Sequence, residues 1–236
     1  VVAGRRFIRM EFTLPQTLPL GYYSAHVRMQ GGSVELATGF RVIVAPARCF
    51  VPEWFERGTR LWGIALQLYS LRSDRNWGVG DFQDLSAVVD WAGTQLGASV
   101  IGLNPLHALK NTAPYHISPY SPTSRLFLNE LYIDVEQVEE CRTDPTARAC
   151  LADATIRARL DAARRSEFVE YDTVAAAKRT VLDLCAQAFA RDNFEGGAPD
   201  RSPTTERGRV FQQYVRQEGE ALAHYATLAS PFTQRE

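Results

Sequence analysis

Hydroxyl and aromatic side chains alternate with two prolines in the segment 115–124, which reads YHISPYSPTS. Each proline fixes its own backbone angle φ and keeps the preceding residue out of the helical region. We therefore expect a stiff, extended loop that holds Ser118 and Tyr120 in fixed positions. Such a loop suits a ligand with hydroxyl edges and apolar faces, as a sugar has. The composition is equally typical of a structural connection, and the residues of the segment alone leave both interpretations open.

The other polar residues near this loop do not form a recognisable metal-binding or catalytic set. His107 and His116 have no carboxylate at a metal-ligand spacing, so we expect a surface role for His116 and a place lining the cleft for His107. Cleavage of a glycosidic bond requires two carboxyl groups that flank it. No such pair is evident among the nearby acids, which are Asp74, Asp81, Asp84, Glu130 and Asp134.

Two glycines in the segment 77–81, WGVGD, are compatible with a phosphate-binding loop only in part. The segment lacks the third glycine of a dinucleotide-binding fingerprint and the lysine of a P-loop. We interpret it as a tight turn that leads into a helix with Asp81 as the N-cap. Asp84 then lies in the first helical turn, and Asp134, which ends an extended segment, is expected to brace a turn.

A strand–helix–strand unit must position the loop. Apolar runs predict buried strands over 61–69 and 99–104, and an apolar stripe with a spacing of three to four residues predicts a helix over 82–96 that ends at Gly97. A connection of this length predicts that the two strands are parallel. The loop then follows the C-terminal end of the second strand, where α/β barrels build their active sites.

The rest of the chain divides into a β-rich beginning and a helical end. Alternating patterns predict strands over 7–12, 21–29 and 40–45, with a hairpin turn at Gly31-Gly32 and a linker over 46–60. Helical periodicity follows over 152–163, 171–190 and 210–228, with a polar loop over 193–203. Only two parallel strands are predicted, and two strands cannot close a barrel.

Composition excludes several classes of protein. The 236-residue chain has a net charge of −1, which gives no support for binding to nucleic acid or to an anionic membrane. The four cysteines, at 49, 141, 150 and 185, lack metal-site spacing and fit the scattered thiols of a cytosolic protein, although a disulfide between Cys141 and Cys150 stays open. No signal peptide or long apolar run is present, but the chain begins with Val1, so we expect that it belongs to something longer.

Five blocks, in order along the chain, closely resemble the 4-α-glucanotransferases, also called amylomaltases or disproportionating enzymes. The blocks are LWGIALQLYSLRS at 61–73, NWGVGDF at 76–82, GLNPLHAL at 102–109, SPYSPTSR at 118–125 and LYID at 131–134. Weaker similarity covers 18–22 and 41–46, which resemble the end of a preceding β-rich domain, and 171–178 and 211–225, which resemble a helical insertion within the barrel.

The resemblance implies an α/β fold in which this chain contributes the first part of a (β/α)8 barrel. Residues 1–50 would be the C-terminal part of a β-rich, sandwich-like domain. Residues 51–236 would begin the catalytic barrel, with a helical insertion at about 140–236. The implied reaction transfers a segment of an α-1,4-glucan to glucose or another glucan with retention of configuration, in the cytoplasm and without a cofactor or metal.

The resemblance also assigns roles to residues of the loop. In the family, the Tyr of the Ser-Pro-Tyr motif packs against the glucose before the cleaved bond and the Ser faces the same site, which implies these roles for Tyr120 and Ser118. Tyr115 corresponds to an aromatic that some members use for more distant glucose units. Glu130 departs from the family, which has Pro there, and we expect it to loosen the extended segment.

The family's catalytic acids, two Asp and one Glu, lie on later barrel strands, so the resemblance implies no catalytic residue in this chain. Two alternatives stay open from the sequence. The chain is a non-catalytic glucan-binding fragment, or it belongs to an α-glucan hydrolase with the same type of barrel.

Overall fold

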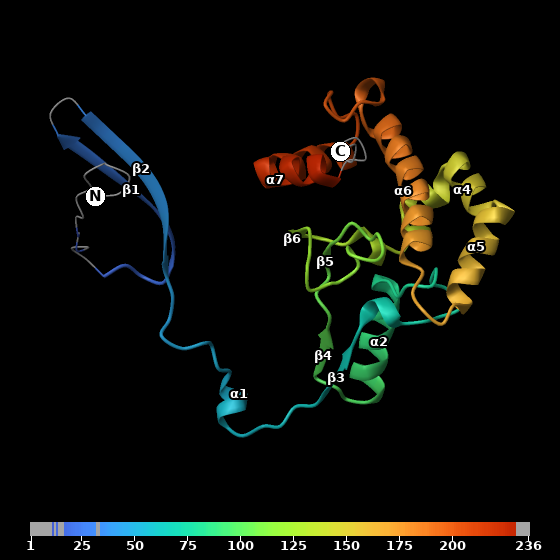
Figure 1. Ribbon diagram of the computed structural model, residues 1–236, viewed down its shortest axis with the longest axis horizontal. Coiled ribbons are helices and arrows are strands. Elements are labelled where there is room, and N and C mark those ends of the chain that lie inside the picture. The colour runs from blue at the N-terminus through green and yellow to red at the C-terminus, as the bar shows by residue number, and fades with distance from the viewer. Residues whose placement is uncertain (1–10, 12, 14–16, 32–33, 230–236) are drawn as a thin grey trace. The chain divides into compact units, whose positions relative to one another are not determined.

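The computed structural model describes residues 11, 13, 17–31 and 34–229 of the chain. The chain falls into two compact units, Val1–Arg60 and Leu61–Glu236. In Figure 1 the first unit carries the strands β1 and β2, and the second carries β3 to β6 and the long helices.

The first unit is built around an antiparallel hairpin of β1 (Gly21–Gly31) and β2 (Val34–Val44). The two strands predicted at 21–29 and 40–45 are thus confirmed, and the second is longer than predicted. Tyr22 pairs with Ile43, and both side chains are mostly exposed, at 80% and 63%. A hairpin that leaves such a pair in water is marginal by itself.

Two features predicted for this unit cannot be compared with the structure. The strand at 7–12 lies outside the described residues except for Glu11, and so does Gly32 of the predicted turn. The predicted linker at 46–60 contains one short helix, α1 (Glu53–Glu56), which no side chain caps.

The second unit begins with the predicted strand–helix–strand unit. The strands β3 (Gly63–Leu66) and β4 (Val100–Leu103) are parallel, as expected, and Gly63 pairs with Val100. A Cβ atom at Gly63 would stand 2.0 Å from the carbonyl oxygen of Val100, so the close approach of the two strands requires a glycine.

The strands are shorter and less buried than predicted. The chain leaves β3 for a single 3₁₀ turn at Leu68–Ser70, and Val100 is 53% exposed. The prediction of burial on both faces was therefore wrong for this chain. The reason is that a parallel sheet is covered on both faces only when neighbouring strands and helices are in place, and this sheet has two strands among the described residues.

The crossover consists of α2 (Phe82–Asp90), which continues as a π-helical segment at Trp91–Gln95. Asp81 caps α2 in a capping box with Asp84, which confirms the predicted start of the helix. Gly97 ends the crossover with a φ of 69°, a conformation that glycine adopts without strain.

A short antiparallel pair follows, formed by β5 (His107–Ala108) and β6 (Ser124–Leu128). The proline-rich loop lies between these two strands. The pair was not predicted, because a two-residue strand has no periodicity that a sequence could display.

Helices make up most of the rest of the second unit. They are α3 (Glu139–Thr143), α4 (Pro145–Ala152), α5 (Ala154–Arg165), α6 (Tyr171–Asn193) and α7 (Glu206–Ala229). The predicted helices are confirmed with shifted ends, and α7 is interrupted at Gly219, where φ is 54°. Ala175 is buried in α6, and its neighbour Ala176 is exposed because it faces away from the core.

The main core lies between these helices, the turn before α2 and the segment that follows β6. Its buried side chains include Trp77, Val79, Leu131, Val135, Cys141, Leu160, Val174, Val181 and Cys185. Four helices and the extended segment before α3 therefore form one packed body. No helix in the described part of the chain is long and apolar enough to cross a membrane.

Candidate functional site

A cavity of about 340 Å³ lies at the C-terminal ends of the two parallel strands. Its lining comes from the last residues of β3 and β4, from the residues that follow them, and from the proline-rich loop: Ala65, Leu66, Gln67, Gly102, Leu103, Asn104 and Tyr120. Ligand sites in α/β proteins form at this end of the strands, because the loops that follow neighbouring strands converge there.

Asn104 ties the strand ends together. Its Oδ1 accepts a hydrogen bond of 2.7 Å from the backbone N–H of Leu68, and its Nδ2 donates to the hydroxyl of Tyr132 at 3.0 Å. Asn104 is buried, so each of these bonds is costly to lose. Asn104 was not among the predicted site residues, although a polar residue that ends an apolar strand before Pro105 is a usable signal in the sequence.

The loop that carries Tyr120 is fastened at its base by a pair of buried asparagines. The side chains of Asn111 and Asn129 donate to each other's oxygen, each at 2.9 Å. Asn111 adopts a φ of 57°, a conformation that asparagine tolerates better than most residues. Within the loop, the N–H of Ser121 donates to the carbonyl of Ser118 at 3.1 Å, which closes the turn that presents Tyr120.

Of the three predicted binding residues, one lines the strand-end cavity and two do not. Tyr120 lines the strand-end cavity, and its side chain is 66% exposed. Ser118 is exposed in the same loop but is not part of the cavity lining. Tyr115 is 84% exposed and also lies outside that lining.

A second concavity of about 570 Å³ borders the other side of the loop, which contributes Ala113 and Ile117. Three aromatic side chains line it, those of Tyr69, Phe168 and Tyr171. These aromatics could not be grouped from the sequence, because they come from segments about 100 residues apart that only folding brings together.

A cluster of charges holds the turn that leads into α2. The guanidinium of Arg75 contacts Asp81 at 2.5 Å, Asp84 at 2.8 Å and Asp134 at 2.7 Å. The hydrogen bond to Asp81, with the charges of all three acids, raises the pKa of Arg75 above its ordinary value despite partial burial. The predicted roles are confirmed, since Asp81 and Asp84 begin the helix and Asp134 braces a turn by accepting from the N–H of Glu136.

The pKa values of Asp84 and Asp134 in this cluster are shifted in opposite directions. Burial acts to raise the pKa of Asp84, but hydrogen bonds from its neighbours outweigh burial and lower it. Burial raises the pKa of Asp134, because the opposing charge of Arg75 does not fully compensate. Both carboxylates are committed to structure, which leaves them poorly suited to attack or protonate a substrate.

Lys178 fastens α6 to the extended segment that follows the loop. Its Nζ donates to the carbonyl oxygens of Leu131 and Ile133, at 2.7 and 2.6 Å. The side chain is only 2% exposed, and this burial lowers the pKa of Lys178 to about 8 even though Asp81 and Asp134 favour the charged form. The sequence analysis attached no role to this lysine.

Glu130 does not loosen the segment, contrary to expectation. It starts a 3₁₀ turn, Glu130–Tyr132, whose N-cap is Asn129, and it pairs with Arg179 of α6 at 2.8 Å. The two residues that follow Glu130 are buried. The ion pair therefore supplies an attachment to α6 in place of the rigidity of a proline.

The strand-end cavity contains no carboxylate, and His107, which was expected to line the cleft, is not part of its lining. Within the described residues, no three His, Cys, Asp or Glu side chains are grouped to hold a metal ion. All four cysteines are free thiols in the structure, so no disulfide joins Cys141 and Cys150. The cavity is thus equipped to bind a ligand by an aromatic ring and amides.

The chain is similar to known proteins along most of its length. A family profile described as 4-alpha-glucanotransferase matches residues 66–230, and one described as MalQ N-terminal beta sandwich domain matches residues 1–46. The crystal structure of amylomaltase from Corynebacterium glutamicum superposes with a TM-score of 0.67 at 30% sequence identity, covering 92% of this chain and 28% of that one.

Curated relatives point to the same family. A 4-alpha-glucanotransferase of Haemophilus influenzae is 33% identical over 205 residues, which are 87% of this chain and 28% of the relative. A 4-alpha-glucanotransferase of Mycobacterium bovis is 35% identical over 195 residues, or 77% of this chain and 25% of the relative. The chain thus spans about a quarter of the length of these relatives. On the match of the family profile to residues 66–230, the chain belongs to the 4-alpha-glucanotransferase family.

Proposed function

We propose that the complete protein to which this chain belongs transfers segments of α-1,4-glucans to glucose or to another glucan, with retention of configuration. The substrates are maltooligosaccharides in the cytoplasm, and the reaction uses no cofactor. In this proposal residues 1–50 end a β-rich domain. Residues 51–236 begin a (β/α)8 barrel and include a helical insertion at about 140–236.

The observation that carries this proposal is the position of Tyr120. Its ring lines the cavity at the C-terminal ends of two parallel strands, where barrels bind substrate. An exposed aromatic ring offers a flat apolar face, and the apolar face of a glucose ring fits against it. The side-chain amides of Gln67 and Asn104 lie in the same lining, where they offer donors and acceptors for sugar hydroxyls.

Ser118 and Tyr115 complete the binding loop in this proposal. Ser118 lies two residues before Tyr120 in a turn closed by its own carbonyl group, and we assign its hydroxyl to the same glucose unit. Tyr115 projects into solvent and would contact glucose units further along a bound chain. Neither role follows from the lining of the cavity, so each needs its own test.

The positions of the carboxyl groups indicate which steps of the reaction this chain can support. A retaining transfer needs one carboxylate as nucleophile and a second carboxyl group as acid and base. Asp81, Asp84 and Asp134 are occupied by Arg75, and no acid lines the cavity. We therefore assign substrate binding to this chain and the covalent steps to acids on other barrel strands.

The decisive experiment is a product analysis of the complete gene product with maltotriose. Transfer predicts free glucose together with maltooligosaccharides longer than the donor. Release of glucose and maltose with no longer product would replace this proposal with an α-glucan hydrolase.

A further inference from the structure

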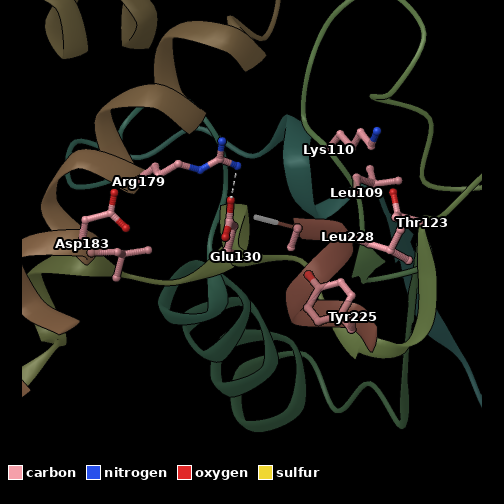
Figure 2. A pocket seen from close by; sticks show the side chains of 10 residues that line it. Leu109, Lys110, Thr123, Glu130, Arg179, Asp183, Tyr225 and Leu228 are labelled. Carbon is pink, nitrogen blue, oxygen red and sulfur yellow. Dashed lines mark hydrogen bonds and ion pairs between the residues drawn. The ribbon is translucent and has the colours of Figure 1, made fainter. Parts of the chain in front are cut away.

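A third cavity, of about 200 Å³, lies between α6, α7 and the segments at both ends of the proline-rich loop (Figure 2). Its lining consists of Leu109, Lys110, Thr123, Glu130, Arg179, Leu182, Asp183, Tyr225, Leu228 and Ala229. None of these residues lines the cavity that contains Tyr120. The two cavities are therefore separate, although one loop contributes to both.

The cavity is lined by equal numbers of cationic and anionic side chains. Glu130 and Arg179 form an ion pair of 2.8 Å, which Figure 2 shows as a dashed line. Asp183 lies one helical turn beyond Arg179 on α6, and Lys110 lies on the loop segment on the other side of the view, with its ammonium group pointing away from the other labelled side chains. In the described part of the chain neither Asp183 nor Lys110 makes a hydrogen bond or ion pair. The cavity thus offers one free carboxylate, that of Asp183, and Lys110 lies at its edge.

An aromatic ring of restricted orientation completes the lining. The ring of Tyr225 stacks on that of Phe127, with centroids 4.5 Å apart and planes inclined by 20°. Burial raises the pKa of the Tyr225 phenol, and the charge of Glu130 adds to the effect. Leu182 and Leu228 extend the apolar part of the wall. Because Phe127 holds the ring in place, little side-chain entropy remains to be lost when a ligand binds.

We propose that this cavity is an accessory binding site for one neutral sugar ring, taken either as a free hexose or as the terminal unit of a glucan. The volume is below the roughly 300 to 1,000 Å³ of pockets for drug-sized ligands, and so suits a single ring. The aromatic ring and leucines match the apolar face of a hexose. Asp183 accepts hydrogen bonds from its hydroxyls.

The mixed charge of the lining disfavours ionic ligands of the same size. Two cations and two carboxylates line the cavity, and one cation is already neutralised by its partner. An anion such as phosphate would meet the carboxylates of Glu130 and Asp183, and a cation would meet Lys110 and Arg179. The site does not depend on the transfer reaction, because it shares no residue with the strand-end cavity.

The test measures the binding of D-glucose to the 236-residue chain by saturation-transfer NMR, in a Tyr120→Ala background that removes the ring of the first site. We expect weak binding, with a dissociation constant on the order of millimolar for so small a ligand. Asp183→Asn, which removes a charged acceptor, should weaken binding about tenfold. Asp200→Asn, on an exposed loop, is the matched control and should bind glucose as its parent does.

A second pair of variants examines the ring. Tyr225→Ala should abolish the glucose signal, and Tyr214→Ala, elsewhere on α7, should leave it unchanged. If Tyr225→Ala loses helical circular dichroism, the comparison of Asp183→Asn with Asp200→Asn tests the site alone. Asp183 is suitable because it is exposed and makes no contact that supports folding.

Three outcomes would overturn the site. They are loss of all glucose binding in the Tyr120→Ala background, equal binding by Asp183→Asn and its parent, and displacement of glucose by inorganic phosphate or by glycine. Competition with maltoheptaose distinguishes a free hexose from the terminal unit of a glucan as the ligand. Competition that depends on Asp183 supports the end of a glucan, and absence of competition supports a free hexose.

Discussion

At the scale of single residues, Tyr120 is the side chain on which the proposed function depends most. It contributes an exposed ring to a cavity whose other walls are backbone, small apolar groups and two amides. No charged group in that lining competes for the position of a neutral glucose unit. The expected contribution of the ring is therefore apolar contact.

Replacement of Tyr120 by alanine tests that contribution in the complete gene product. Loss of roughly 80 Å² of apolar contact costs about 2 kcal/mol, which corresponds to about thirtyfold in kcat/KM for transfer. Tyr120→Phe keeps the face of the ring and should stay within about threefold of the parent, an estimate that allows for one exposed hydrogen bond. Transfer by Tyr120→Ala at the parental rate would remove the stacking role.

Lys178 gives a prediction about stability and pH. Its pKa is about 8 in the folded protein and 10.5 in the unfolded chain, so the unfolded chain binds more protons between these values. Stability from this group should therefore rise with pH from about 8 upward. Above pH 9 the thiol of Cys141, whose pKa burial raises to about 12, acts in the opposite direction because the folded state then holds the extra proton. Between pH 8 and 9 the contribution of the lysine is the larger of the two, because the unfolded thiol, with an ordinary pKa of 9.0, is at most half ionised there.

Urea denaturation of the parent and of Lys178→Met across that window is the measurement. At pH 9 the methionine variant should be about 1 to 3 kcal/mol less stable than the parent, because the carbonyls of Leu131 and Ile133 lose their donor. Below pH 8 the difference should be smaller, because burial of the charged lysine then weakens the parent. It should also lose the rise between pH 8 and 9. A rise of equal size in both proteins would assign the pH dependence to another group.

At the scale of elements, two aspartates cap helices in different surroundings. Asp153 caps α5 at the surface by accepting from two N–H groups, those of Thr155 and Ile156. Asp81 caps α2 in the same way but also pairs with Arg75 in a partly buried cluster. The same residue type at the same helical position is therefore expected to contribute different amounts to the free energy of unfolding.

Alanine substitution at each position separates capping from the charge cluster. Asp153→Ala should cost about 1 kcal/mol, the usual value for a lost N-cap. Asp81→Ala should cost about 3 kcal/mol or more, because it also removes a partner from a buried ion pair. Urea midpoints of the two variants provide the comparison, and equal losses would mean that Arg75 contributes nothing beyond the cap.

At the scale of the whole molecule, the proposed glucan site at the strand ends has no carboxyl group in its lining. We predict that the 236-residue chain by itself binds maltoheptaose in calorimetric titration and forms no transfer products. Tyr120→Ala should weaken this binding, and Tyr214→Ala is the control. Transfer by this chain alone would show that a carboxylate assigned here to structure is catalytic.

Several features could be predicted from the sequence because the information is local. The parallel pair of strands follows from two apolar runs and a connection of helical length, and the start of α2 follows from Asp81 and Asp84 three residues apart. The ordered blocks at 61–134 were sufficient to indicate the family, which the match to residues 66–230 then established. The loop with Tyr120 could likewise be placed after the second strand.

Other features could not be predicted, because they depend on contacts between residues far apart in the chain. The hydrogen bond from the N–H of Leu68 to Asn104 spans 36 residues, and the ion pair of Arg75 with Asp134 spans 59. Periodicity reports which face of an element is apolar but not which element covers it. Hence neither the burial of Lys178 nor the exposure of the two-stranded sheet was visible in the pattern.

The sequence by itself thus determined the local elements, the family and the loop that carries Ser118 and Tyr120. Only the tertiary structure decided that Tyr120, and neither Ser118 nor Tyr115, lines the strand-end cavity. It also decided that Glu130 pairs with Arg179 at a separate cavity. The physical reason is that a ligand site is a surface formed by several elements, and the position of each side chain on that surface depends on how the elements pack.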